Sequence, residues 1–248
     1  MTPASHPGTY VVLGATGAVG SRLAQHLAER GASLVLLGRD EDRLRAVAEP
    51  LGARHAMLPG VKASVVKDTL VQACAGTPIA GIANCIGSLL LKPAQRTSEA
   101  EWQDVLDVNL SSAFGVAMAA AELCSGGGAV VFVSSVAATL GLANHEAIAA
   151  AKAGLIGLAR AAAATHARRG IRFHCVAPAL VASHMTADLL ARAGMREATG
   201  KMNPRGRIGE PDDVVRAIAF LLDPANTWLN GQVLGTDGGY GVLRPVTG

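Results

Sequence analysis

The sequence predicts an α/β fold in which helices cover both faces of a doubly wound parallel sheet. Three observations support this prediction. Short apolar runs alternate with helical patterns along the whole chain of 248 residues. A glycine-rich turn joins the first run to the first helix, and no linker-like stretch or fixed repeat interrupts the alternation. We therefore expect one dinucleotide-binding domain of the Rossmann type over residues 10–248, after a disordered tail at residues 1–9.

The first strand, turn and helix contain the strongest local pattern. Residues 10–13 form a short apolar run, as expected for a strand covered on both faces. Gly14, Gly17 and Gly20 follow it, three residues apart. Glycines let a phosphate approach the backbone closely, and the amides of the following helix then point at the phosphate. The pattern predicts a dinucleotide site, although its spacing is GxxGxxG rather than GxGxxG. A glycine-rich turn without a ligand is the alternative.

The second strand is predicted at residues 33–37 and ends in Gly38, Arg39 and Asp40. In a dinucleotide fold this strand end meets the adenosine ribose. Arg39 suits the 2′-phosphate of NADP, because a guanidinium is a strong phosphate partner. An acidic residue at the tip would favour NAD instead, and the neighbouring Asp40 keeps NAD possible. A solvated loop charge is the alternative interpretation of Arg39.

The remaining elements continue the same alternation. Strands are predicted at residues 54–58, 79–86, 129–133, 171–176 and 232–236, and helices at 61–75, 98–123, 146–168 and from 211 onward. Ser98 and Glu101 form a capping box at the start of the second of these helices. Ligands of such sheets bind beyond the carboxyl ends of the strands. One rim should therefore collect Gly14, Gly38, Gly87, Ser135 and Pro178.

Composition and charge exclude several classes of protein. Half of the residues are apolar and 17% are charged, which is enough apolar material for a large core. The net charge of +3 is too small, and the basic residues too scattered, to indicate nucleic-acid binding. No apolar segment is expected to span a bilayer, and residues 1–10 lack the features of a secretion signal. The four cysteines form no CxxC, so we expect reduced thiols, no metal site and a cytoplasmic protein.

Several segments together resemble the short-chain dehydrogenase/reductase family. LGATGAVG at residues 13–20 resembles the coenzyme turn of that family, and ANCIG at 83–87 resembles its NNAG segment. VVFVSS resembles the strand that delivers the active-site serine, and APALVASHM resembles the PGxVxTxM segment that closes over nicotinamide. RIGEPDDVV and GTDGGY resemble its C-terminal signatures. The resemblance covers the chain nearly end to end and implies an oxidoreductase that uses NADP or NAD.

The resemblance also implies the roles of individual residues. Ser135 would polarise the substrate oxygen, Lys152 would hold the nicotinamide ribose, and Asn109 would support a chain of waters. The segment 183–205 would form a lid over an apolar or mixed substrate pocket. The implied coenzyme-binding residues are Gly14, Thr16, Gly17, Gly20, Arg39, Asn84, Gly87, Lys152, Pro178 and Ser183.

One departure from the family pattern matters most for function. The active site of the family pairs a tyrosine with a lysine four residues later, and this spacing puts both side chains on one helical face. Here Lys152 holds the lysine position, but Ile148 stands four residues before it. Ser135 precedes Ile148 by the interval usual for the serine and tyrosine of the family. Ile148 therefore aligns with the tyrosine position, and the phenol is absent. Neither Tyr10 nor Tyr240 can be its sequence equivalent.

Three hypotheses follow from the missing phenol. His145 lies seven residues before Lys152, the interval of the enoyl reductase branch, and a histidine can act as acid or base near neutrality. The positive charge of Lys152 would make it a poorer acid, which Glu146 could offset, and an ordinary loop histidine is the alternative. Second, a conjugated alkene would need little help with the proton beyond Ser135 or water. Third, the protein could bind coenzyme without redox activity, as a silent subunit, a sensor, or a repurposed lyase or isomerase.

The sequence therefore predicts an NADP-preferring oxidoreductase with a non-standard proton donor. Its substrate would be a small carbonyl, alcohol or enone, and neither nucleic acid nor a membrane is expected as a partner. By resemblance, a homodimer or homotetramer would pair the helices that carry Asn109 and Lys152. His174 in the sixth strand is interpreted as a structural histidine with satisfied hydrogen bonds.

Overall fold

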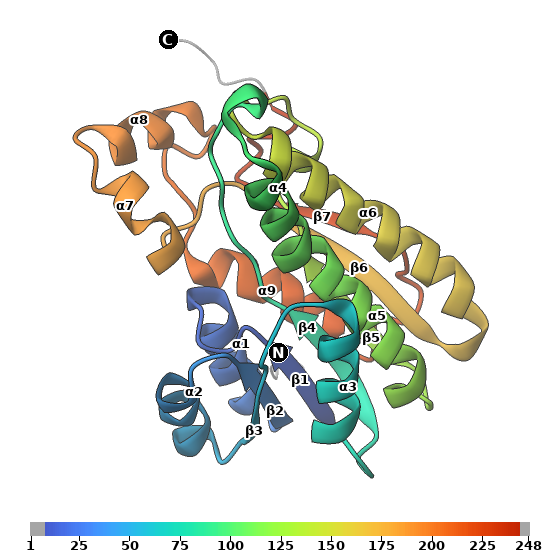
Figure 1. Cartoon of the computed structure of the whole chain (residues 1–248). Coiled ribbons are helices and arrows are strands. Elements are labelled where there is room, and N and C mark those ends of the chain that lie inside the picture. Colours follow the sequence, from blue (N-terminus) through green and yellow to red (C-terminus); the bar gives the residue numbers. More distant parts are fainter. Residues whose placement is uncertain (1–7, 244–248) are drawn as a thin grey trace.

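The computed structural model describes residues 8–243 and contains one sheet of seven strands in the order β3-β2-β1-β4-β5-β6-β7. All neighbouring strands pair in parallel, so the predicted doubly wound sheet is confirmed (Figure 1). The strands are β1 (Thr9–Leu13), β2 (Ser33–Gly38), β3 (Arg54–Met57), β4 (Ile79–Asn84), β5 (Gly128–Val133), β6 (Ile171–Pro178) and β7 (Val233–Thr236). The strand order reverses direction between β1 and β4, where sheets of this kind bind their ligands.

Helices cover both faces of this sheet. The described helices are α1 (Ala18–Ala28), α2 (Glu41–Ala48), α3 (Ala63–Ala73), α4 (Glu99–Leu106), α5 (Ser112–Leu123), α6 (Glu146–His166), α7 (Ala187–Leu190), α8 (Met195–Met202) and α9 (Pro211–Leu222). Helices α3, α5 and α6 share one buried core with Val11 and Leu13 of β1. Helices α1, α2 and α9 share the other with Tyr10 and Val12. Successive residues of β1 thus serve opposite cores, which explains why the whole strand is apolar.

The long helical stretch predicted over residues 98–123 is interrupted in the middle. Ser98 and Glu101 form the expected capping box, and α4 begins at the next residue, Glu99. A π-helical turn at Asp107–Ser111 then separates α4 from α5. Such a turn inserts an extra residue into the helix and is frequent at functional sites. It carries Asn109, whose side chain is buried.

The segment 183–205 stands apart from the sheet as a small lobe that contains α7 and α8 (Figure 1). The family resemblance implies a lid here, and the structure shows short helices preceded by a 3-10 turn at His184–Thr186. Thr186 is buried at the start of this lobe and Asn203 at its end. We call this segment the lid.

Several predicted boundaries differ from those observed. The predicted tail at residues 1–9 lies outside the described residues up to residue 7, and Thr9 already belongs to β1. The strand predicted over residues 79–86 stops at Asn84, because the Asn84 side chain accepts a hydrogen bond from the Ile86 amide and turns the backbone. The other elements agree with the prediction to within a few residues.

One helix bears on the expectation that no apolar segment is long enough and free of charge to span a bilayer. Residues Glu146–Arg169, which are α6 and its short extension, form one described helix that is long and apolar enough. Half of that stretch is buried inside the fold. Leu155, Ile156 and Ala159 of α6 belong to the core that covers one face of the sheet. The helix therefore owes its apolar character to this packing.

Candidate active site

The glycine turn after β1 is packed so closely against backbone atoms that side chains have no room there. Gly14 has a φ of +71°, and a Cβ there would lie 2.9 Å from the Cys85 carbonyl carbon. A Cβ on Gly20 would collide with the Gly14 carbonyl oxygen. Gly17 begins α1, which has no side-chain cap and no acidic residue in its first turn. The first amides of α1 are thus left for an anion, and the residues fit the pyrophosphate of a dinucleotide.

Two arginines follow β2 and differ in their placement. Arg39 is exposed. Arg43, in the first turn of α2, lines the cavity beside the glycine turn and donates to the Thr16 carbonyl oxygen at 3.1 Å. Asp40 caps α2 by accepting from the Arg43 amide at 3.0 Å. The acidic neighbour of Arg39 therefore holds the helix start, and Arg43 is the cation that faces the site.

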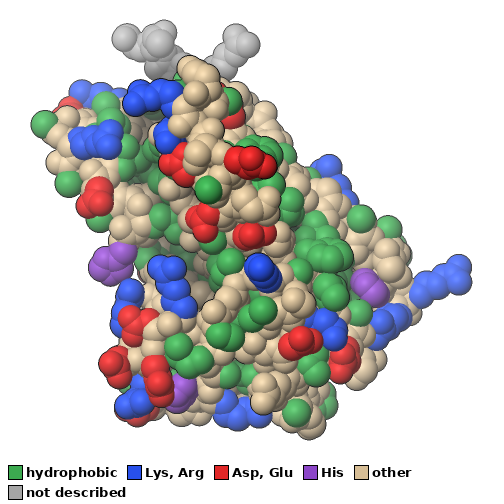
Figure 2. Space-filling view, in the orientation of Figure 1, with side chains coloured by type: hydrophobic (Ala, Val, Ile, Leu, Met, Phe, Trp, Pro, Cys, Tyr) green, Lys and Arg blue, Asp and Glu red, His purple; other side chains and the backbone are tan. Residues whose placement is uncertain are grey.

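A cavity of about 540 Å³ runs from the glycine turn to the lid. In Figure 2 hydrophobic side chains line a hollow between the lobe of α7 and α8 and the body of the molecule. The cavity brings together eight of the predicted site residues, namely Gly17, Gly20, Gly87, Ser135, His145, Lys152, Pro178 and Ser183. Gly14, Thr16, Arg39, Asn84 and Asn109 lie behind its wall or outside it.

Ser135 and Lys152 reach the cavity from the tip of β5 and from α6. Ser134 donates its hydroxyl to the Lys152 carbonyl oxygen at 2.8 Å, and the Lys152 ammonium donates to the Val133 carbonyl oxygen, also at 2.8 Å. These reciprocal bonds fix the strand tip against the helix. Burial lowers the pKa of Lys152 to about 8. Ser135 accepts from the Ala137 amide at 3.1 Å, which leaves its proton for a ligand or for the distant Pro178 carbonyl at 3.5 Å.

Asn109 supports the wall from behind. Its side-chain oxygen accepts from the Ser88 amide at 3.2 Å, and its amide group donates to the Ser88 hydroxyl and the Val105 carbonyl. A Cβ on Gly87 would lie 3.3 Å from the Asn109 side-chain oxygen and 3.5 Å from the Lys152 nitrogen. Gly87 therefore keeps the space between these two side chains open. The Asn109 side chain holds the loop after β4 in place.

The chain is similar to known proteins over nearly its whole length. The sequence profile described as Enoyl-(Acyl carrier protein) reductase matches residues 14–241. A galactitol 2-dehydrogenase (L-tagatose-forming) from Cereibacter sphaeroides is 34% identical over 244 residues, which are 93% of this chain and 94% of the relative. A cis-4-hydroxycyclohexanecarboxylate dehydrogenase from Sinomonas cyclohexanicum is 34% identical over 243 residues, which are 93% of this chain and 95% of the relative.

The similarity extends to solved structures. One is described as an NAD(P)-dependent gluconate 5-dehydrogenase from Beutenbergia cavernae with bound NADP at low occupancy. It superposes with a TM-score of 0.88 at 30% identity, covering 96% of this chain and 98% of that chain. The chain belongs to the short-chain dehydrogenase/reductase family. The family binds NAD(P), and its members named here are oxidoreductases.

In this dehydrogenase/reductase the phenol position holds a buried hydrocarbon. Ile148 lines the cavity one helical turn before Lys152, and its side chain packs with Val105, Ala147 and Ala151. Because Ile148 can neither donate nor accept a proton, the lysine and serine of the family face the cavity without their usual partner. The structure thus places a hydrocarbon at this position.

His145 lies on the same wall, directly before α6. Its Nδ1 lies 2.8 Å from the Ala143 carbonyl oxygen. A carbonyl can only accept, so this contact assigns the proton to Nδ1 and leaves Nε2 as the free nitrogen. Asn144 just before it has a φ of +62°, and its carbonyl accepts from the Lys92 amide. The turn that carries His145 is therefore held by its own backbone.

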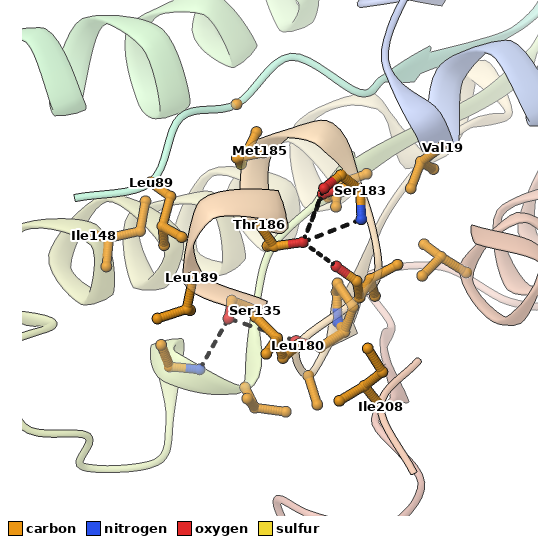
Figure 3. A pocket seen from close by; sticks show the side chains of 18 of the residues that line it. Val19, Leu89, Ser135, Ile148, Leu180, Ser183, Met185, Thr186, Leu189 and Ile208 are labelled. Carbon is orange, nitrogen blue, oxygen red and sulfur yellow. Dashed lines mark hydrogen bonds between the residues drawn. The ribbon is translucent and has the colours of Figure 1, made fainter. Parts of the chain in front are cut away.

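Ser183 and Pro178 bracket the entrance to the lid. The Ser183 amide donates to the Thr186 hydroxyl at 3.1 Å, and that hydroxyl donates to the Val181 carbonyl at 2.7 Å (Figure 3). These bonds tie the first turn of the lid to the end of β6. Both residues line the cavity, as the family pattern predicts.

Two residues on the cavity wall are not anticipated by the sequence. Arg43 is separated from the β2 tip by a helical turn, so the strand-end rule points to Arg39 instead. Tyr240 is not the sequence equivalent of the missing phenol, yet it lines the same cavity from the turn after β7. Asp237 builds that turn by accepting from the amides of Gly239 and Gly241. The only sequence signal for Tyr240 is that β7 ends on the same rim as the other parallel strands.

His174 corrects a further expectation. It is fully buried in β6, and within residues 8–243 neither ring nitrogen has a hydrogen-bond partner. The sequence analysis expects a satisfied structural histidine. Burial, with a smaller contribution from Arg172, lowers the pKa of His174 to about 4. The residue is therefore a neutral, unpaired member of the sheet core.

Proposed function

We propose that this protein is an NADP-preferring oxidoreductase that transfers hydride between the coenzyme and a small ketone, alcohol or enone, with a proton donor other than tyrosine. One observation carries this proposal. The closed glycine turn and the free start of α1 open into the same cavity as Ser135 and Lys152. A dinucleotide bound at the turn would extend its far end toward these two side chains.

The preference for NADP rests on the tip of β2. Arg43 faces the cavity, and Arg39 is exposed beside it. Asp40 is engaged as the cap of α2, so its carboxylate is unsuited to bind the two ribose hydroxyls of NAD. Two guanidinium groups near the ribose would favour the extra phosphate of NADP. Binding of NAD remains possible at the same turn.

Each group around the reacting carbon has a distinct role in this proposal. NADPH, when bound, supplies the hydride that adds to the carbonyl carbon. Ser135 donates a hydrogen bond to the carbonyl oxygen, and Lys152 holds the nicotinamide ribose. His145, whose Nδ1 proton is held by the Ala143 carbonyl, would first take up a proton from solvent on Nε2 and then pass that proton to the substrate oxygen. Asn109 keeps the loop around Gly87 in place so that the cavity stays open.

The test is NADPH consumption with a panel of ketones, quinones and enones, in the wild-type protein and in His145→Ala. We expect turnover with at least one member and a loss of about 10²-fold or more in kcat for the variant, because a positioned acid contributes about that factor. His55→Ala is the matched control, since His55 is exposed on β3 at the far edge of the sheet. Turnover that survives His145→Ala unchanged would exclude the histidine as proton donor.

A second candidate function is favoured by Ile148. A hydrocarbon at the phenol position is what a coenzyme-binding protein without redox activity would retain. Tight NADPH binding with no turnover on any member of the panel would support a silent subunit, a sensor, or a repurposed lyase or isomerase. Calorimetry that detects no affinity for either NADPH or NADH would contradict both candidates.

We also propose that the chain forms a homodimer or homotetramer through the helices that carry Asn109 and Lys152. Trp102 of α4 and Phe114 and Met118 of α5 are large hydrophobic side chains that remain exposed. Grouped apolar side chains of this size are typical of protein interfaces. Light scattering coupled to gel filtration should give a multiple of 25.2 kDa, and Phe114→Glu should shift the mass toward one chain.

A further inference from the structure

The substrate side of the cavity is walled largely by hydrocarbon side chains. They come from the loop after β4, from the start of α6 and from the lid, and include Leu89, Leu142, Ile148, Met185, Leu189 and Met202. In Figure 3 Leu89, Ile148 and Leu189 are grouped on one side of the cavity, with Ser135 near them. A ligand that lies against Ser135 would therefore contact mainly apolar atoms.

Three polar side chains in the lid or just after it, Thr186, Asn203 and Arg207, are already engaged with the protein. The Thr186 hydroxyl is bonded to the Val181 carbonyl and to Ser183. Asn203 donates to the Asp237 carbonyl at 2.8 Å and accepts from the Arg205 amide at 2.9 Å. The Arg207 guanidinium makes two hydrogen bonds to the Asp213 carboxylate, at 2.6 and 3.0 Å. A ligand would have to break these bonds before using the same atoms.

The polar side chains that remain for a substrate on the described part of the wall are fewer than the apolar ones and include Ser88, Ser135, His145, His184, Thr199 and Tyr240. Ser135 and the free nitrogen of His145 serve the reacting oxygen. Tyr240 lines the cavity on a turn that Asp237 holds by two backbone amides, and it can meet one further polar group. The hydroxyls of a polyol or a sugar acid that face the apolar part of the wall would be left without partners, which lowers affinity about tenfold for each one left unpaired.

We propose that the substrate is a compact, largely hydrophobic ketone or the corresponding alcohol, and that polyols and sugar acids are disfavoured. This inference rests on the proposed function, because it names the substrate class of the same site. The walls select by burial of apolar surface, and the short supply of free hydrogen-bonding groups selects against hydroxyls.

The test compares two ligands on coenzyme-saturated protein by calorimetry. One is 1-decalone with NADP present, and the other is galactitol with NADPH present, because neither pair can transfer hydride and both therefore report binding alone. We expect 1-decalone to bind at least 100-fold more tightly than galactitol. Galactitol binding with equal or higher affinity would overturn the proposal, and so would the absence of any 1-decalone binding.

Variants of the lid locate the binding surface. Leu189 lines the cavity and its neighbour Leu190 in α7 does not, so the two form a matched pair. We expect Leu189→Gln to weaken 1-decalone binding about tenfold, as for loss of a buried leucine contact, and Leu190→Gln to change it less than twofold. Met185→Gln, at an exposed and cavity-lining position, provides a second variant that does not depend on core packing. Equal effects of the two leucine variants, or no effect of Leu189→Gln and Met185→Gln, would contradict the assignment.

The outcomes also separate this inference from the proposed function. Binding of 1-decalone without consumption of NADPH would support the substrate class and count against hydride transfer. Oxidation of galactitol with NADP as coenzyme would support the oxidoreductase and overturn the substrate class.

Discussion

The two halves of the cavity are specified by different kinds of atoms. The coenzyme half is built from backbone, because Gly14 and Gly20 leave no room for a Cβ and α1 begins without a side-chain cap. The substrate half is built from side chains, and on its wall Ile148 occupies the position of a phenol. The coenzyme half retains the pattern of the family, whereas the substrate half departs from it.

This difference shows how chemistry can change within a fixed scaffold. A glycine turn that fits a pyrophosphate tolerates few substitutions, because any side chain there meets backbone atoms that cannot move away. A side chain on the surface of a cavity can be exchanged as long as its volume fits the space. The four predictions below test this contrast, from the largest expected effect to the smallest.

The largest effect is expected from Ile148→Tyr, which adds a phenol to the substrate half. The new hydroxyl would lie one helical turn from Lys152, whose charge would lower the phenol pKa and favour proton exchange. We expect NADPH-dependent reduction of a ketone to rise by about 10²–10⁴-fold, the usual contribution of a positioned acid. Ile148→Phe is the control for volume. Equal rates in the two variants would mean that a phenol at this position has no access to the substrate oxygen.

The next prediction concerns a substitution that disrupts the coenzyme half of the cavity. Gly20→Val places a branched side chain against the Gly14 carbonyl and should lower NADPH affinity by about 100-fold, as loss of a well-fitted charged contact does. Gly157→Ala is the control, since a Cβ at Gly157 meets nothing within 4 Å. Both proteins should be compared by calorimetry after a folding check by circular dichroism. NADPH affinity within threefold of wild type in Gly20→Val would show that the turn does not bind the coenzyme.

A smaller effect is expected from a substitution that tests coenzyme preference without disturbing the glycine turn. Arg43→Gln should weaken NADPH binding by about tenfold and leave NADH binding unchanged, because only NADPH carries the 2′-phosphate. Arg45→Gln is the control on the same helix, where Arg45 pairs with Glu41 on the exposed side. The readout is the ratio of the two dissociation constants. A parallel loss of both coenzymes would assign Arg43 to the pyrophosphate or to the structure of the turn.

The smallest effect on activity is expected in the sheet core, at His174 of β6. The folded pKa of about 4 lies below the ordinary value of 6.5, so the unfolded chain takes up the proton first as the pH falls. As the pH falls from about 6.5 to about 4, the free energy of unfolding therefore decreases progressively, by about 3 kcal/mol in total. His174→Leu should remove this slope in urea unfolding and leave coenzyme binding unchanged. An identical slope in His174→Leu would mean that another group causes it; His55→Leu, at an exposed site, is the control.

Much of the coenzyme half could be predicted from the sequence because its rules are local. Spaced glycines after an apolar run, a capping box at Ser98 and Glu101, and the end of each parallel strand are visible in short stretches. The same rules place Ser135, Gly87 and Pro178 on one rim, and the cavity contains all three. The absent phenol at Ile148 is equally local, because it follows from counting along one helix.

The rest could not be predicted because it depends on contacts between distant segments. The approach of Arg43 to the Thr16 carbonyl requires the angle at which α2 leaves β2. Tyr240 reaches the cavity through a turn near the end of the chain, and the π-helical turn around Asn109 leaves no periodic signal. The unpaired state of His174 likewise depends on which neighbours surround β6.

The lid is fastened at both of its ends. Thr186 bonds to the Val181 carbonyl near the start, and Asn203 bonds to the Asp237 carbonyl near the end. A segment held at both ends can move outward in its middle, between α7 and α8, but it cannot rotate away from the body about one end. Molecules that exchange with solvent must then pass through an aperture set by this flexing, so their width governs the speed of entry and departure independently of affinity.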